Sequence, residues 1–121
     1  MTKPAVCHWE IMGKDGKKTR EFYAKLFDWD IKLWGNMDYG MVEGTGQGTI
    51  GGGVGGVQPG QKPTTVFYVL VDDLQAYLDR AGKLGGKTLM PPTKISDEIG
   101  SFAMFADPDG NTIGLFKNAP R

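Results

Sequence analysis

The chain has 121 residues, with fourteen basic and fourteen acidic side chains and a formal net charge of zero. This length favours one compact domain, and the balanced charge disfavours nucleic acid as a partner. The longest aliphatic and aromatic run, residues 66–71, is too short to cross a membrane, and no apolar signal-peptide core follows the N-terminus. The single cysteine, Cys7, fits a reducing compartment. We therefore expect a cytoplasmic domain without nucleic-acid or membrane partners.

The first half of the chain predicts a strand, a helix and three further strands. Residues 5–12 alternate in polarity, which places His8 and Glu10 together on one face of a strand. A helical stripe follows at spacings of three and four, after a cap at Asp15 or a nearby residue. The stripe consists of Thr19, Phe22, Tyr23, Leu26 and Phe27, and the later strands are predicted at residues 29–34, 39–43 and 49–54.

The second half predicts the same order of elements. Residues 66–71 form a strand, Asp72 or Asp73 caps a helix, and the glycines after residue 81 end that helix. Strands are predicted at residues 87–90, where Pro91-Pro92 follows, and at 101–106 and 112–117. The apolar stripe of the second helix consists of Leu74, Tyr77, Leu78 and Ala81.

A short internal repeat supports a structure that is built twice. The tripeptide Thr-Ile-Gly occurs at residues 49–51 and again at residues 112–114, which are 63 residues apart. In the earlier part of each half, His8 corresponds to Val66, at an interval of 58 residues. The Pro- and Gly-containing residues 58–65 are the expected joint between the two halves.

Four motifs in this order resemble the glyoxalase/bleomycin-resistance/dioxygenase group, the vicinal oxygen chelate superfamily, in its lactoylglutathione lyase-related single-domain type. They are His-x-Glu-Ile from His8, Glu-Phe-Tyr-x-x-Leu-Phe-x-Trp from Glu21, Val-Asp-Asp-Leu from Val71, and Asp-Pro-x-Gly-Asn-x-Ile-Gly-Leu from Asp107. The resemblance covers about residues 6–117. It implies one α+β domain over residues 1–121, with module one at about 5–57 and module two at about 64–117. Each module is βαβββ, and the two would form a curled, cup-shaped sheet with helices outside.

The resemblance also implies a divalent metal held by four side chains, two from each module, which would stabilise an enolate or related intermediate. Carried over by position, the first-strand ligands fall on His8 and Val66, and the last-strand ligands on Gly51 and Gly114. Valine and glycine side chains cannot bind a metal, and even catalytic zinc sites use about three protein ligands. We therefore expect no metal and no other cofactor.

His8 can instead contact a ligand or act as a base, or it can be an ordinary structural histidine. Glu10 on the same face could fix its tautomer or raise its pKa. Tyr68, on the matching strand of module two, could supply a hydroxyl or a stacking surface, although a core aromatic is the simpler interpretation. The absent side chains at Gly51 and Gly114 would enlarge a pocket. The candidate ligand-binding residues are His8, Glu10, Tyr68, Gly51 and Gly114.

The glycine-rich segment at residues 44–60 contains two matches to G-x-G-x-x-G. A dinucleotide site needs a helix directly after the glycines, and residues 54–59 do not predict one. A thin strand with room for a ligand beside it is the better interpretation.

These observations predict a glyoxalase-like protein with a degenerate metal site, which binds an apolar or aromatic metabolite or drug in the cup. The alternative is an enzyme, a lyase, isomerase or dioxygenase-like protein, that uses His8 and Glu10 with or without a divalent metal. A third possibility is an interaction module without a ligand. By analogy with similar single-domain proteins, we expect a homodimer.

Overall fold

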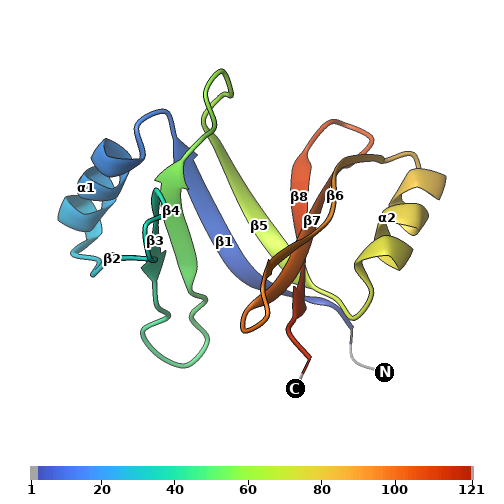
Figure 1. The fold of residues 1–121 in the computed structure, drawn as a ribbon, viewed down its shortest axis with the longest axis horizontal. Helices are drawn as coiled ribbons and strands as arrows, with labels where there is room; N and C mark the ends of the chain where they lie inside the picture. Colours follow the sequence, from blue (N-terminus) through green and yellow to red (C-terminus); the bar gives the residue numbers. More distant parts are fainter. Residues whose placement is uncertain (1–2, 121) are drawn as a thin grey trace. The chain divides into compact units, whose positions relative to one another are not determined.

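The computed structural model describes residues 3–120 (Figure 1). Strand, helix and three strands follow one another twice, so the predicted α+β class with two βαβββ modules is confirmed. The first set is β1 (Ala5–Gly13), α1 (Gly16–Phe27), β2 (Lys32–Leu33), β3 (Tyr39–Val42) and β4 (Gly52–Gly56). The second set is β5 (Thr64–Leu70), α2 (Leu74–Lys83), β6 (Lys87–Ser96), β7 (Gly100–Ala106) and β8 (Thr112–Asn118).

The chain forms two compact units, whose boundaries fall inside β1 and β5. Among the described residues, His8–Val66 make up the first module, and residues 67–120 with residues 3–7 make up the second. The strand order is β2-β3-β4-β1 in the first module and β5-β8-β7-β6 in the second. In each module the first strand pairs in parallel with the last one, and the other pairs are antiparallel.

The second module has a packed apolar core beneath α2. Asp73 caps this helix by accepting a hydrogen bond from the backbone N–H of Ala76 at 3.0 Å. Asp73 is one of the two residues predicted for this cap. Of the predicted helical stripe, Leu74 and Leu78 are buried and Tyr77 packs beside them. The core consists of Val71, Leu74, Leu78, Ala103 and Leu115, with Val69, Tyr77 and Phe105 against it.

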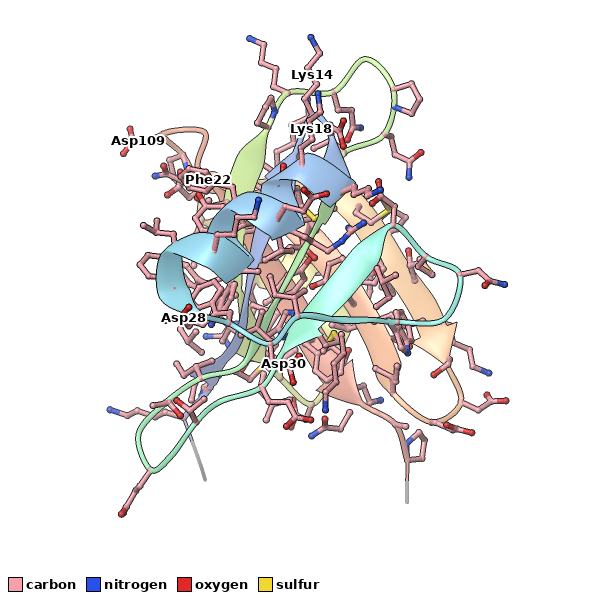
Figure 2. All side chains as sticks on the ribbon, turned by 90° about the vertical axis from the view of Figure 1, so that its left-hand side faces the viewer. Lys14, Lys18, Phe22, Asp28, Asp30 and Asp109 are labelled. Carbon is pink, nitrogen blue, oxygen red and sulfur yellow. The ribbon has the colours of Figure 1, made fainter. Side chains whose placement is uncertain are left out.

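The first module buries its helix less completely. Asp15 caps α1 by accepting from the N–H of Lys18 at 3.1 Å, and the helix packs against β4. Only part of the predicted stripe faces inward. The side chains of Phe22 and Leu26 are 59% and 57% exposed. Figure 2 shows Phe22 on the outer surface of α1. This helix therefore carries more apolar surface than its own module covers.

Three strands differ in extent from their predictions. β2 contains only two residues, and β4 begins at Gly52 rather than at residue 49. β6 continues through Pro91-Pro92 to Ser96, with register shifts between Met90 and Thr93. The prolines are tolerated because β6 is the last strand of its module, where a missing N–H and a bulge disrupt few ladder bonds. No helix within residues 3–120 is long and apolar enough to cross a membrane.

Candidate functional site

A hydrogen bond between His8 and Tyr39 is the main polar feature of the first module. His8 Nε2 lies 2.8 Å from the hydroxyl oxygen of Tyr39. His8 comes from β1 and Tyr39 from β3, and β4 lies between these two strands. The tyrosine side chain must therefore extend across β4 to reach the imidazole.

The glycines of β4 make room for this tyrosine. A Cβ atom at Gly53 would collide with the hydroxyl and ring of Tyr39, and one at Gly55 would lie 2.9 Å from the ring. Gly53 and Gly55 point to the same face because side-chain directions alternate along a strand. The sequence thus leaves this face of β4 bare, and the ring of Tyr39 fills the space.

The opposite face of β4 is covered in the same way. A Cβ atom at Gly52 would collide with the indole ring of Trp9. Trp9 Nε1 donates a hydrogen bond to the carbonyl oxygen of Ile50 at 2.8 Å, and its ring lies 5.1 Å from that of Trp29. Aromatic rings from neighbouring strands therefore replace the absent side chains of β4 on both faces.

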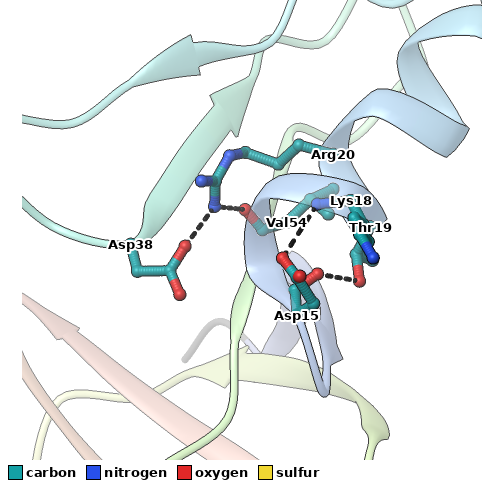
Figure 3. Close-up of polar contacts among 6 residues, drawn as sticks. All are labelled: Asp15, Lys18, Thr19, Arg20, Asp38 and Val54. Carbon is teal, nitrogen blue, oxygen red and sulfur yellow. Dashed lines mark hydrogen bonds and ion pairs between the residues drawn. The ribbon is translucent and has the colours of Figure 1, made fainter.

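An ion pair fixes the start of β3, directly before Tyr39 (Figure 3). Arg20 Nη1 on α1 donates to Asp38 Oδ1 at 2.8 Å and lies 3.5 Å from the carbonyl oxygen of Val54. The carboxylate of Asp38 lies in a space that Cβ atoms at Gly16 and Gly56 would occupy. Arg20 and these glycines therefore position the backbone from which Tyr39 extends.

Burial sets the charge state of the imidazole. The surrounding protein lowers the pKa of His8 below its usual value of 6.5, because desolvation disfavours the charged form. The ring is therefore neutral at pH 7, and the tautomer decides whether the Tyr39 hydroxyl donates or accepts the shared proton. Glu10 lies on the same face of β1, two residues further on, and pairs in register with Gly53.

The second module repeats the combination of tyrosine and glycine. Tyr68 on β5 is 7% exposed, and it pairs in register with Gly114 on β8. A Cβ atom at Gly114 would collide with the ring of Tyr68. Gly114 pairs in turn with Met104, and the ring of Phe102 lies edge-on at 6.5 Å from Tyr68. This face is apolar and aromatic.

The strand registers show which glycines correspond. Glu10 and Tyr68 are 58 residues apart, and their partners across the parallel pairs are Gly53 and Gly114. The Thr-Ile-Gly repeat had matched Gly114 to Gly51. Gly51 instead precedes β4, where a Cβ atom would lie 3.0 Å from the carbonyl oxygen of Val42. Sequence reasoning also missed Tyr39, although the alternate glycines at 53 and 55 were a sign that a large neighbour covers them.

The side chains do not fit the metal that the resemblance implied. Within residues 3–120, no three His, Cys, Asp or Glu side chains gather in a group that could hold a metal ion. Gly53 and Gly114 have no donor atoms, and tyrosine rings occupy the space next to them. Val66 likewise offers no ligand. These side chains therefore give no basis for a reaction step at a metal ion.

The family model described as Glyoxalase/Bleomycin resistance protein/Dioxygenase superfamily matches residues 5–115. A glyoxylase-like domain-containing protein of Didymella fabae is 31% identical over 112 residues, which are 88% of each chain. A superfamily member of known structure from Vibrio splendidus has a TM-score of 0.62 at 15% identity, over 96% of this chain and 99% of that one.

The chain also matches a longer protein. CFP32 of Mycobacterium bovis, which is named as a glyoxylase, is 28% identical over 114 residues. The match covers 89% of this chain and 43% of that protein, so the chain spans less than half of that relative's length.

Replacing Gly53 with alanine should break the contact between His8 and Tyr39. The added methyl group occupies the place of the tyrosine hydroxyl, so Tyr39 must move away from the imidazole. His8 is the single histidine, so its ring resonances can be followed alone by NMR during a pH titration. We expect a wild-type pKa below 6.5, and a value closer to 6.5 in Gly53→Ala as water reaches the ring.

The matched control for this experiment is Gly82→Ala in α2, where an added Cβ meets nothing within 4 Å. It should leave the His8 titration unchanged. An unaltered titration in Gly53→Ala would contradict the role given to this glycine.

The lowered pKa of His8 also predicts how stability depends on pH. Below pH 6.5 the unfolded chain binds a proton on His8 that the folded chain resists. The free energy of unfolding should therefore fall as the pH drops through 6.5, until the pH reaches the folded-state pKa. Urea denaturation of wild type and His8→Gln between pH 7.5 and 5.5 measures this. As the pH drops, the free energy of unfolding of the wild type should fall relative to that of His8→Gln. An equal pH dependence in the two proteins would contradict a buried, neutral His8 ring.

Proposed function

Because the chain belongs to the Glyoxalase/Bleomycin resistance protein/Dioxygenase superfamily, we propose that it binds an apolar or aromatic small molecule, a metabolite or a drug, without a metal ion. The observation that carries the proposal is the pair of glycines, Gly53 and Gly114, at the positions opposite Glu10 and Tyr68. Tyrosine rings cover both glycines. Small-molecule sites are mostly apolar with a few polar groups that fix orientation, and within the first module the Tyr39 ring and its hydrogen bond to His8 combine the two.

His8 and Tyr39 are the polar anchor in this proposal. A neutral imidazole and a phenol offer a donor and an acceptor but no charge, which suits a carbonyl, hydroxyl or amide group. An anionic ligand would be disfavoured, because the carboxylate of Glu10 shares the same face of β1. The ligand class is therefore neutral at its polar end.

The second module has an apolar face of its own. Tyr68, Phe102 and Met104 lie on the sheet face opposite the α2 core. Aromatic edges and faces attract planar rings, and an unbranched thioether adapts to different shapes. This face by itself suits an aromatic or conjugated group better than a sugar or a phosphate.

A thermal-shift screen with neutral aromatic amides, phenols and quinones tests this function. A ligand at 100 times its dissociation constant adds about 2.7 kcal/mol of stability, which raises Tm by roughly 10 °C in a chain of this size. For any ligand found, Tyr39→Phe and His8→Ala should weaken binding at least tenfold. Cys7→Ala, on the other face of β1, is the matched control and should bind normally. If no neutral aromatic compound stabilises the protein, the proposal fails.

An acid–base enzyme is the second candidate, and the His8–Tyr39 hydrogen bond favours it. A neutral imidazole beside a hydroxyl can accept a proton from a substrate while the phenol donates to a developing negative charge. Glu10, on the same face of β1, would orient the ring in such an enzyme. Turnover that survives EDTA and is lost in His8→Ala would establish this enzyme. Binding without turnover, with the same His8 dependence, would leave the protein as a ligand carrier or sequestering protein.

The cytoplasmic location remains part of the proposal, supported by the cysteine chemistry. Cys7 is the single cysteine and is free, so no intrachain disulfide contributes to stability. Partial burial raises the pKa of the Cys7 thiol above its usual value and keeps it protonated and unreactive.

A further inference from the structure

Arg20 on α1 is a largely buried cation whose partners lie beside the tyrosine of the candidate site. Its side chain is 14% exposed, whereas that of its carboxylate partner Asp38 is 61% exposed. A charge that leaves water is costly unless an opposite charge or a polar group compensates it. Figure 3 shows Arg20 Nη1 between the Asp38 carboxylate and the Val54 carbonyl oxygen, at 2.8 and 3.5 Å. Asp38 directly precedes Tyr39, and Val54 lies between the two glycines of β4 that the Tyr39 ring covers.

The stem of Arg20 contacts the backbone on the other side of Tyr39. A Cβ atom at Gly40 would lie 2.9 Å from Arg20 Cδ, so the glycine leaves free the space that the stem occupies. Gly40 in turn pairs in register with Val54. The same arginine therefore holds the residues before and after Tyr39, through its charge at Asp38 and through its methylene groups at Gly40.

Arg20 acts from the face of the sheet that is opposite to the tyrosine ring. Side-chain directions alternate along a strand, so Tyr39 points away from the face of β3 on which Gly40 meets Arg20. The ring lies over Gly53 instead and reaches His8 with its hydroxyl. Any influence of Arg20 on the imidazole must therefore pass through the backbone of β3 and β4.

We propose that Arg20 is a positioning residue for the candidate site, which clamps the backbone on both sides of Tyr39 and so holds the tyrosine hydroxyl at His8. This role rests on the proposed function and extends the site to α1, on the other face of the sheet. Without the clamp the start of β3 can shift, and a small shift is enough to break a hydrogen bond of 2.8 Å. Ligand affinity, or turnover in the acid–base alternative, should then fall about tenfold, as is typical for a remote coupled residue.

A graded series at position 20 tests the clamp, with the NMR titration of His8 as the readout. Arg20→Lys keeps the charge and a long stem, and its ammonium can replace the hydrogen bond from Nη1 to Asp38. Arg20→Met keeps the stem but loses the charge, and Arg20→Ala loses both. The pKa of His8 should stay near the wild-type value in Arg20→Lys and rise towards 6.5 in Arg20→Met. It should rise furthest in Arg20→Ala, as water reaches the ring.

A double-mutant cycle tests whether Arg20 acts through Asp38. Asp38→Ala alone leaves the buried guanidinium without its carboxylate, so it should change the His8 titration about as much as Arg20→Met does. If the two residues act as one clamp, Arg20→Met combined with Asp38→Ala should shift the titration no further than the larger single change. Additive shifts would overturn the clamp. Should Arg20→Ala fail to fold, Asp38→Ala provides the same test at a mostly exposed side chain.

Two controls separate positioning from a merely structural role. Arg80→Ala makes the same truncation on α2, where Arg80 lies over the ring of Tyr77 at 5.2 Å, and it should leave the His8 titration unchanged. Urea denaturation of each variant measures its stability separately. A wild-type His8 titration in Arg20→Met and Asp38→Ala, whatever their stability, would overturn the proposal. The titration needs no ligand, so this failure is distinct from a thermal-shift screen that finds no neutral aromatic ligand.

Discussion

The structure depends on bare glycine backbone that aromatic side chains cover. In β4, Gly52 accommodates Trp9 on one face, and Gly53 and Gly55 accommodate Tyr39 on the other. Glycine in a strand normally costs stability because it packs nothing. Here aromatic rings from the adjacent strands pack against the glycines, so a glycine-rich segment still forms an ordered strand. The same solution holds Tyr68 over Gly114 in the second module.

This constraint connects the fold to the chemistry of the site. A glutamate at Gly53 would displace Tyr39, and a glutamate at Gly114 would displace Tyr68. The carboxylates that the resemblance implied and the tyrosines present here thus exclude each other sterically. His8 consequently meets a phenol at 2.8 Å, and burial keeps its imidazole neutral. A neutral hydrogen-bonding pair suits the proposed binding or proton transfer better than Lewis-acid chemistry.

Much of the fold was predictable from local pattern. The strand that contains His8, the caps Asp15 and Asp73 and the stripe of Leu74 and Leu78 depend on residues near in sequence, and the structure agrees with them. The contact between His8 and Tyr39 was not predictable, because it depends on the register of three strands and on a ring that lies across β4. The Thr-Ile-Gly repeat misled for the same reason. Sequence similarity matched Gly51 to Gly114, whereas strand pairing matches Gly53 to it.

The central claim is that tyrosine rings cover Gly53 and Gly114, so that neither position can carry a metal-binding side chain without displacing a ring. Calorimetric titration of the purified, EDTA-treated protein with Ni²⁺, Zn²⁺, Mn²⁺ and Fe²⁺ tests it most directly. Our account predicts no stoichiometric binding by any of the four ions, since no donor set within residues 3–120 suits them. Tight one-to-one binding that disappears in His8→Ala would contradict the account and establish a metal site with other ligands.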